Sequence, residues 1–269
     1  MAGAEATRGA EGTAAAPGQG PALDVEGRVA TITLRRPGLA NRLEPQDLDT
    51  LLTQLATVDG RPEVLVLRLQ GQGRHFCSGF NVGRVGADSA AIGARFEALA
   101  DAIERARPVT VAVLQGGAHG GAVDLALACD FRVGGPDSVM RVPAVRLGLH
   151  FYQAGLERMV QRAGLPAARR ILLAAEMLDA TALQRLTLLD RVAGSTEAVA
   201  AVAEAFCAEL AAGAPLALLP MKRHLAAIVR GALDAGALAG DIATAAASSD
   251  LQEGTRAWRE KRAARFEGH

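Results

Sequence analysis

The 269-residue sequence is poor in features that mark several protein classes. Its three cysteines are far apart and form no Cys-x-x-Cys pair, which argues against a disulfide framework or a zinc knuckle. The 29 basic residues balance 29 acidic ones, whereas nucleic-acid-binding proteins usually carry a cationic excess. No apolar run reaches the roughly 18 residues that a membrane-spanning helix needs. We therefore expect no metal site, no nucleic-acid partner and no membrane contact.

The N-terminal stretch is also poor in core-forming residues. Residues 1–22 contain no Val, Ile, Leu or aromatic residue, so we expect a disordered tail there. The same stretch lacks the apolar centre of a signal peptide, and the few cysteines fit a reducing compartment. These two observations predict a cytoplasmic protein.

The remaining chain alternates between strand and helix patterns. A hairpin closed at Gly27, a helix from Pro45 and a helix that stops before Pro108 are expected from turn residues and apolar spacing. Three β-branched or apolar segments predict strands: Val29 to Leu34, Val64 to Leu69 and Val109 to Leu114. This alternation indicates an α/β core. Because helical spacing dominates later, we divide the chain into a core at 23–205 and a helical C-terminal region at 206–269.

Two glycine-containing segments follow predicted strands. The first is Phe76-Cys77-Ser78-Gly79-Phe80-Asn81, and the second is Gly120-Gly121-Ala122-Val123-Asp124. Each segment can aim one backbone N–H at the same carbonyl oxygen and stabilise an oxyanion. Asp124, about one helical turn beyond Gly121, can move a proton next to that carbonyl. Taken alone each segment is a weak signal, because such turns also serve packing.

Taken together, these segments resemble the enoyl-CoA hydratase/isomerase (crotonase) superfamily. The resemblance spans about residues 23 to 269 and includes Arg36-Pro37, Asn41, Pro143, Leu147-Gly148-Leu149 and the Ser249 to Gly254 ending. It implies an α/β ββα spiral core with a helical C-terminal trimerisation region. It also implies a homotrimer or a dimer of trimers, an acyl-CoA or acyl-carrier-protein thioester as substrate, and no cofactor apart from the substrate's own coenzyme A.

The resemblance assigns roles to individual residues. The oxyanion N–H groups are those of Phe80 and Gly121, and Asp124 is the acid on the following helix. The family's hydratases carry a second acid in a Pro-Glu pair, where this chain has Pro143-Ala144. His150 and Tyr152 are further candidates for proton transfer. The expected substrate-binding residues are Ser78, Gly79, His119, Gly120, Ala144 and Phe151.

A single carboxylate restricts the reaction. Alanine at position 144 cannot share the work of hydration, so an isomerase, or an atypical hydratase (a lyase) assisted by His150 or Tyr152, is favoured over two-acid hydration. Two alternatives stay open. One is a non-catalytic scaffold or thioester-binding subunit, and the other is an acyl-CoA decarboxylase or hydrolase.

Overall fold

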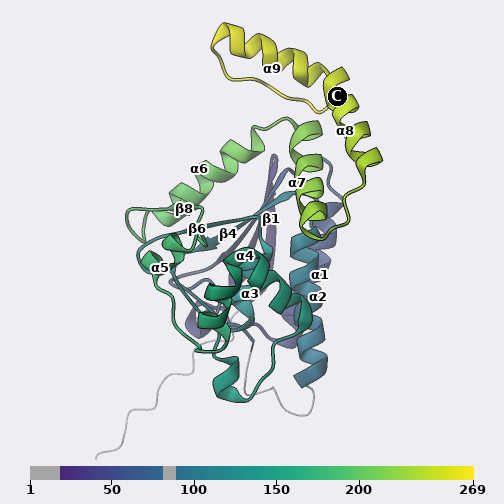
Figure 1. Cartoon of the computed structure of the whole chain (residues 1–269). Helices are drawn as coiled ribbons and strands as arrows, with labels where there is room; N and C mark the ends of the chain where they lie inside the picture. The colour runs from purple at the N-terminus through teal and green to yellow at the C-terminus, as the bar shows by residue number, and fades with distance from the viewer. Residues whose placement is uncertain (1–18, 81–88) are drawn as a thin grey trace, which may run out of the picture.

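A computed structural model describes residues 19–80 and 89–269 (Figure 1). The strands are β1 (Gln19–Glu26), β2 (Val29–Arg35), β3 (Val66–Gly71), β4 (Val109–Leu114), β5 (Gly117–His119), β6 (Phe131–Gly134), β7 (Val139–Arg141) and β8 (Arg191–Val192). The α-helices are α1 (Pro45–Asp59), α2 (Ser89–Arg105), α3 (Gly121–Ala128), α4 (Gln153–Leu172), α5 (Ala180–Arg185), α6 (Val199–Ala211), α7 (Pro215–Val229), α8 (Ala235–Ala247) and α9 (Ser249–Glu260). The 3-10 helices in the described ranges are η1 (Pro37–Leu39) and η3 (Ala144–Leu147).

A six-stranded sheet in the order β1-β2-β3-β4-β6-β8 forms the framework. β1 and β2 are antiparallel and turn at Gly27, whose φ of 56° suits a glycine. The other neighbouring strands are parallel. A second sheet pairs β5 with β7. The predicted hairpin and the predicted α/β core are therefore confirmed.

Helices cover both faces of the large sheet. Alternate residues of β3 point to opposite sides, so that Leu67 and Leu69 join one core cluster and Val66 joins another. The first cluster packs against α1, α2 and α3, and the second against α6 through Val199 and Phe206. Figure 1 shows α1 and α2 together on one side and α6 on the other. This packing fixes the carboxyl end of β4, after which β5 leads into the second glycine segment.

The N-terminal strand starts earlier than expected. β1 begins at Gln19, inside the stretch predicted to be disordered, because pairing with β2 orders residues that have little core-forming character of their own. Arg35 donates to the carbonyl oxygen of Gly20, and Gln54 donates to that of Pro21. Residues 1–18, the rest of that predicted tail, lie outside the described part.

The C-terminal helices form an arm. The boundary that we placed at residue 206 falls inside α6, because Phe206 and Cys207 continue the packing of that helix on the sheet. The arm instead follows α6, and α8 and α9 extend away from the sheet in Figure 1. No single helix in the described residues is long and apolar enough to cross a membrane; α6 and α7 reach that length only as a pair bent by 106°. The cytoplasmic location stays a prediction.

Candidate active site

The two glycine segments lie side by side. Cys77 donates its N–H to the carbonyl oxygen of Gly117 at 3.1 Å and accepts from the N–H of His119 at 3.0 Å. A Cβ built on Gly79 would lie 3.6 Å from the backbone nitrogen of Gly121. Segments 40 residues apart in sequence are therefore brought within contact distance by the pairing of residue 77 with β5.

The backbone N–H groups of Phe80 and Gly121 are the predicted oxyanion donors. Gly121 is the first residue of α3, and the first N–H groups of a helix have no partner within it. Neither N–H donates a hydrogen bond to any residue in the described ranges. By contrast, the N–H of Gly120 is used by the carbonyl oxygen of Arg141 at 2.8 Å. Two N–H groups on adjacent loops, both without an acceptor among the described residues, are suited to stabilise an oxyanion. Asn81, at the end of the first segment, lies outside the described residues.

Gly79 allows the close approach of these two loops, and its replacement should therefore lower the activity. Gly79 has a φ of +87°, and an added Cβ would lie 2.5 Å from the carbonyl oxygen of His119. We expect Gly79→Ala to lower turnover at least about tenfold, because small displacements of catalytic groups have large effects. Gly27→Ala is the matched control, since Gly27 also has a positive φ but nothing lies within 4 Å of its added Cβ. Steady-state kinetics and thermal melts of both variants test this, and equal effects would contradict it.

Asp124 is fully buried and held by one oxygen. Its Oδ2 accepts a hydrogen bond from the Tyr152 hydroxyl at 2.8 Å and from Nη1 of Arg158 at 2.7 Å. Its Oδ1 is buried and has no hydrogen-bond partner in the described chain. Burial raises the pKa of Asp124, while the guanidinium of Arg158 and the hydroxyl of Tyr152 oppose that rise. The carboxylate is thus fixed in orientation with one oxygen left to accept a proton.

Tyr152 lies next to Asp124 as a donor. It occupies the N-cap position of α4, and its ring stacks on Phe151 with ring centres 4.8 Å apart. Burial and the neighbouring Asp124 carboxylate raise the pKa of the phenol. Tyr152 therefore stays protonated and is suited to donate a hydrogen bond rather than to act as a base.

The other predicted residues occupy less direct positions. His150 is exposed, and its Nδ1 lies 2.7 Å from the carbonyl oxygen of Phe151 rather than near Asp124. The ring of His119 lies against Gly117, and burial, with smaller contributions from His75 and Arg141, lowers its pKa. The hydroxyl of Ser78 donates to the carbonyl oxygen of Leu39.

Ala144 and Cys77 complete the surroundings without acting as acids or bases. Ala144 begins η3 directly after Pro143 and packs partly buried against the core. Burial raises the pKa of Cys77 to about 12, so its thiol supports the loop and is a poor nucleophile. Its Sγ accepts the N–H of Gly79. The roles proposed for Ala144 and Cys77 require no charge on either side chain.

Sequence reasoning missed the charged residues behind Asp124. Arg158 on α4 is 2% exposed and joins Asp124 to the acidic side chains of Asp101 and Glu104 on α2. A signal was present, because Glu97, Asp101 and Glu104 recur at spacings of four and three, which places them on one helix face. Glu97 itself accepts the N–H of Ala154 in the first turn of α4.

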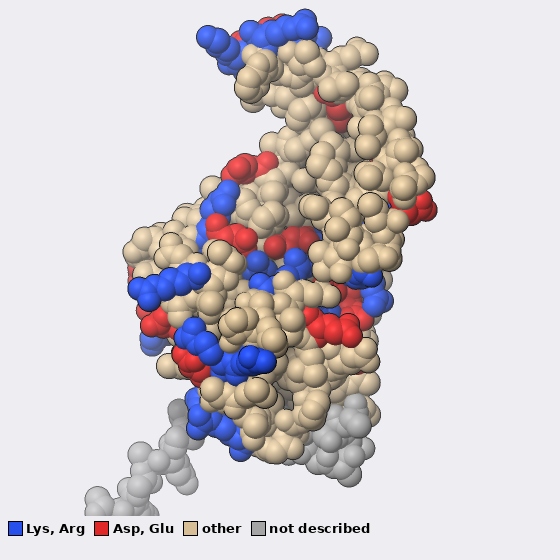
Figure 2. Space-filling view, in the orientation of Figure 1, with Lys and Arg blue, Asp and Glu red and all other residues tan. Residues whose placement is uncertain are grey.

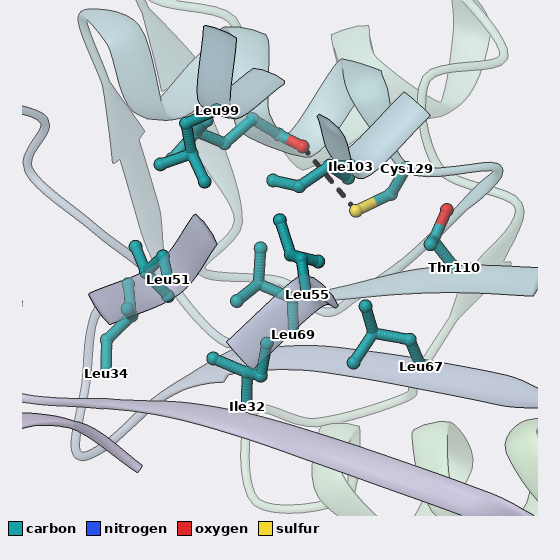
Figure 3. Close-up of a pocket in the computed structure, with 11 residues that line it drawn as sticks. Ile32, Leu34, Leu51, Leu55, Leu67, Leu69, Leu99, Ile103, Thr110 and Cys129 are labelled. Carbon is teal, nitrogen blue, oxygen red and sulfur yellow. Dashed lines mark hydrogen bonds between the residues drawn. The ribbon is translucent and has the colours of Figure 1, made fainter. Parts of the chain in front are cut away.

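An enclosed space between the large sheet and α1 to α3 is lined mainly by leucine and isoleucine side chains (Figure 3). Its volume of about 10 Å³ makes it an ordinary packing gap in the core, too small for an acyl chain. Within residues 19–80 and 89–269, no group of three or more His, Cys, Asp or Glu side chains is arranged to hold a metal ion.

Comparison with known proteins identifies the family of this chain. The sequence profile described as enoyl-CoA hydratase/isomerase matches residues 24–269. A probable enoyl-CoA hydratase of Mycobacterium tuberculosis is 32% identical over 197 residues, which cover 73% of this chain and 78% of the relative. The (E)-benzylidenesuccinyl-CoA hydratase of Thauera aromatica is 28% identical over 257 residues, with 91% and 98% covered.

Solved structures show the same fold. A protein from Magnetospirillum magneticum described as an enoyl-CoA hydratase/carnithine racemase superposes with a TM-score of 0.87 at 26% identity. The match covers 93% of this chain and 96% of that one. The expected crotonase-like α/β fold is therefore confirmed, and the chain belongs to the enoyl-CoA hydratase/isomerase family.

Proposed function

We propose that this chain is an acyl-thioester isomerase in which Asp124 is the only carboxylate that moves a proton. The N–H groups of Phe80 and Gly121 would bind the thioester carbonyl oxygen. The observation that carries the proposal is the state of Asp124, which has Oδ2 occupied by Tyr152 and Arg158 and Oδ1 free.

The proton movements of such an isomerisation balance with one acid/base group. Oδ1 of Asp124 takes the α proton of a 3-enoyl thioester, and the electrons move to give a dienolate with its charge on the carbonyl oxygen. The two N–H groups stabilise that charge. The protonated Asp124 then returns the proton to the γ carbon and forms the 2-enoyl thioester. A carboxylate whose pKa is raised by burial suits both halves of this cycle.

Hydration is less well supported by the residues present. Position 144 is alanine, and the nearby acids Asp101 and Glu104 are occupied by Arg158. Tyr152 would be the group that assists hydration if it occurs, since its hydroxyl is already bonded to Asp124. Coenzyme A is the carrier that we propose, because the relatives described above are named as hydratases of CoA thioesters.

An experiment on the wild-type protein separates these reactions. 2-Enoyl and 3-enoyl thioesters of CoA and of an acyl carrier protein are incubated in deuterated water and followed by NMR. We expect migration of the double bond with deuterium incorporation and little 3-hydroxy product. A hydrated product would instead indicate the atypical hydratase. Carbon dioxide or free thiol would indicate a decarboxylase or hydrolase, and binding without chemistry would indicate a scaffold.

Restoring a second carboxylate should change the products. Ala144→Glu places an acid at the position where the family's hydratases carry theirs, and we expect hydration of a 2-enoyl thioester to rise at least about tenfold. Ala144→Gln is the matched control, because it has the same size without the charge. If the wild type already hydrates as fast as Ala144→Glu, the single-carboxylate proposal is wrong.

We further propose that the arm is covered by other copies of the chain in a trimer or a dimer of trimers. Figure 2 shows few charged side chains over α7 and α8. Large apolar side chains of the arm are more than half exposed: Met221, Leu225, Ile228, Val229, Ile242, Leu251 and Trp258. An apolar surface of this kind usually marks a protein interface. Light scattering of the whole chain measures the assembly, and a monomer at micromolar concentration would contradict it.

A further inference from the structure

Arg158 is shared by three carboxylates. Its Nη1 lies 2.7 Å from Oδ2 of Asp124, while its Nη2 lies 2.7 Å from Oδ1 of Asp101 and 3.5 Å from Oε2 of Glu104. With 2% of its side chain exposed, Arg158 is poorly screened by water. The positive charge of Arg158 therefore interacts with two acids of α2 as well as with Asp124.

Glu104 stands at the centre of a second set of contacts. Its carboxylate lies 3.2 Å from Nη2 of Arg230 and 3.7 Å from Nη2 of Arg162. Arg230 directly follows α7, the first helix after α6, and is the C-cap of that helix. A chain of ion pairs thus runs from Asp124 on α3, through Arg158 and Glu104, to the end of α7.

The charged and titratable groups around this chain come from all of the elements packed there. They are Glu97, Asp101, Glu104 and Arg105 from α2, Arg107 just after α2, Tyr152 from the start of α4, Arg158 and Arg162 from α4, Lys222 and Arg223 from α7, and Arg230 at the end of α7. Arg105 pairs with Asp101 at 2.7 Å and is 65% exposed. Glu104 is the member that faces both Arg158 and the cations farther from Asp124.

Electrostatics gives the two ends of this chain opposite effects on Asp124. Glu104 and Asp124 pair with the same guanidinium. The negative charge of Glu104 therefore favours protonation of Asp124. The positive charge of Arg230 neutralises Glu104 and weakens that effect. A neutral residue at 104 should therefore make Asp124 a weaker base, and a neutral residue at 230 should make it a stronger one.

We propose that Glu104 is a positioning residue that acts on Asp124 through Arg158, and that Arg230 at the end of α7 controls how strongly it does so. This inference rests on the proposed role of Asp124. It connects the C-terminal helices, which form the arm, to the protonation of the catalytic carboxylate. The ion pairs of Glu104 and Arg230 link them to Asp124 through Arg158, so we expect their effect on the reaction to pass through charge.

Two substitutions with opposite expected effects test the inference. In Glu104→Gln the acidic limb of the pH–rate profile for α-hydrogen exchange should move to lower pH, and in Arg230→Gln it should move to higher pH. Each shift should be about 0.5 to 1 pH unit, as expected for a partly screened charge several ångströms away. A ¹³C NMR titration of the Asp124 side-chain carboxyl, assigned by its loss in Asp124→Asn, should show the same two shifts without substrate.

Arg170→Gln is the matched control, because Arg170 forms an exposed pair with Glu176 outside this network. It should leave both titrations unchanged. Thermal melts of all variants report structural damage, which would change stability without moving the two titrations in opposite directions.

The outcomes separate this inference from the proposed function. If Asp124→Asn abolishes exchange but Glu104→Gln and Arg230→Gln leave the titration unmoved, or move it in the same direction, the inference is overturned and the proposed function stands. If no protein exchanges hydrogen, the proposed function fails. The carboxyl titration then still decides whether Glu104 and Arg230 act on Asp124.

Discussion

Arg158→Met is expected to lower the free energy of unfolding by about 3–5 kcal/mol. The substitution removes the buried cation bonded to Asp124, and a buried charge left without its partner is strongly destabilising. Asp101 and Glu104 lose the same partner, although both are partly exposed and regain some hydration. Methionine keeps much of the side-chain volume, so the loss reports the charge more than a cavity.

Denaturant unfolding at one fixed protein concentration measures this loss, since subunit association would otherwise contribute. Arg170→Met provides the control, because its exposed pair with Glu176 should be worth less than about 1 kcal/mol. The double variant Asp124→Asn/Arg158→Met should recover part of the stability lost in Arg158→Met. Equal losses in Arg158→Met and Arg170→Met would show that the buried pair does not hold this region together.

Asp124→Asn is expected to reduce double-bond isomerisation by about 10²–10⁴-fold. Asparagine can still accept the hydrogen bond from Tyr152 but cannot take a proton. The thioester should bind within a few-fold of its normal affinity, because the N–H groups of Phe80 and Gly121 are unchanged.

The rate of isomerisation and the dissociation constant of a CoA thioester are measured separately for this prediction. Asp49→Asn is the control, since the Asp49 side chain is 70% exposed on α1 and pairs with Arg95 at the surface. An Asp124→Asn protein that retains more than a tenth of wild-type activity would exclude Asp124 as the proton-transferring group.

Helices and strands whose ends are set by neighbouring residues were predicted from the sequence. The helix from Pro45 begins as expected, with Glu44 and Asp47 forming a reciprocal capping box, and β4 has the predicted bounds. β3 begins at Val66 rather than at Val64, because the N–H of Val64 donates to Arg61 in the preceding turn and the N–H of Leu65 donates to Arg28 between β1 and β2. The start of β1 at Gln19 could not be predicted, since it depends on pairing with β2.

The site was predictable in part for the same reason. Gly79, Gly121 and Asp124 belong to short motifs, and motifs can be read without knowing the fold. Arg158 lies 34 residues beyond Asp124 and 57 beyond Asp101, so its contacts arise only when α2, α3 and α4 pack together. His150 was predicted from its position in the sequence, but it is exposed and its ring contacts the carbonyl oxygen of Phe151.

The most direct test of the account is hydrogen exchange at the α carbon of a saturated acyl-CoA, followed by NMR in deuterated water with the wild type and with Asp124→Asn. A saturated ester cannot isomerise or be hydrated, so exchange reports enolate formation alone. The account predicts exchange by the wild type and its loss in Asp124→Asn, with binding retained in both. Binding without exchange by the wild type, or equal exchange by the two proteins, would contradict it.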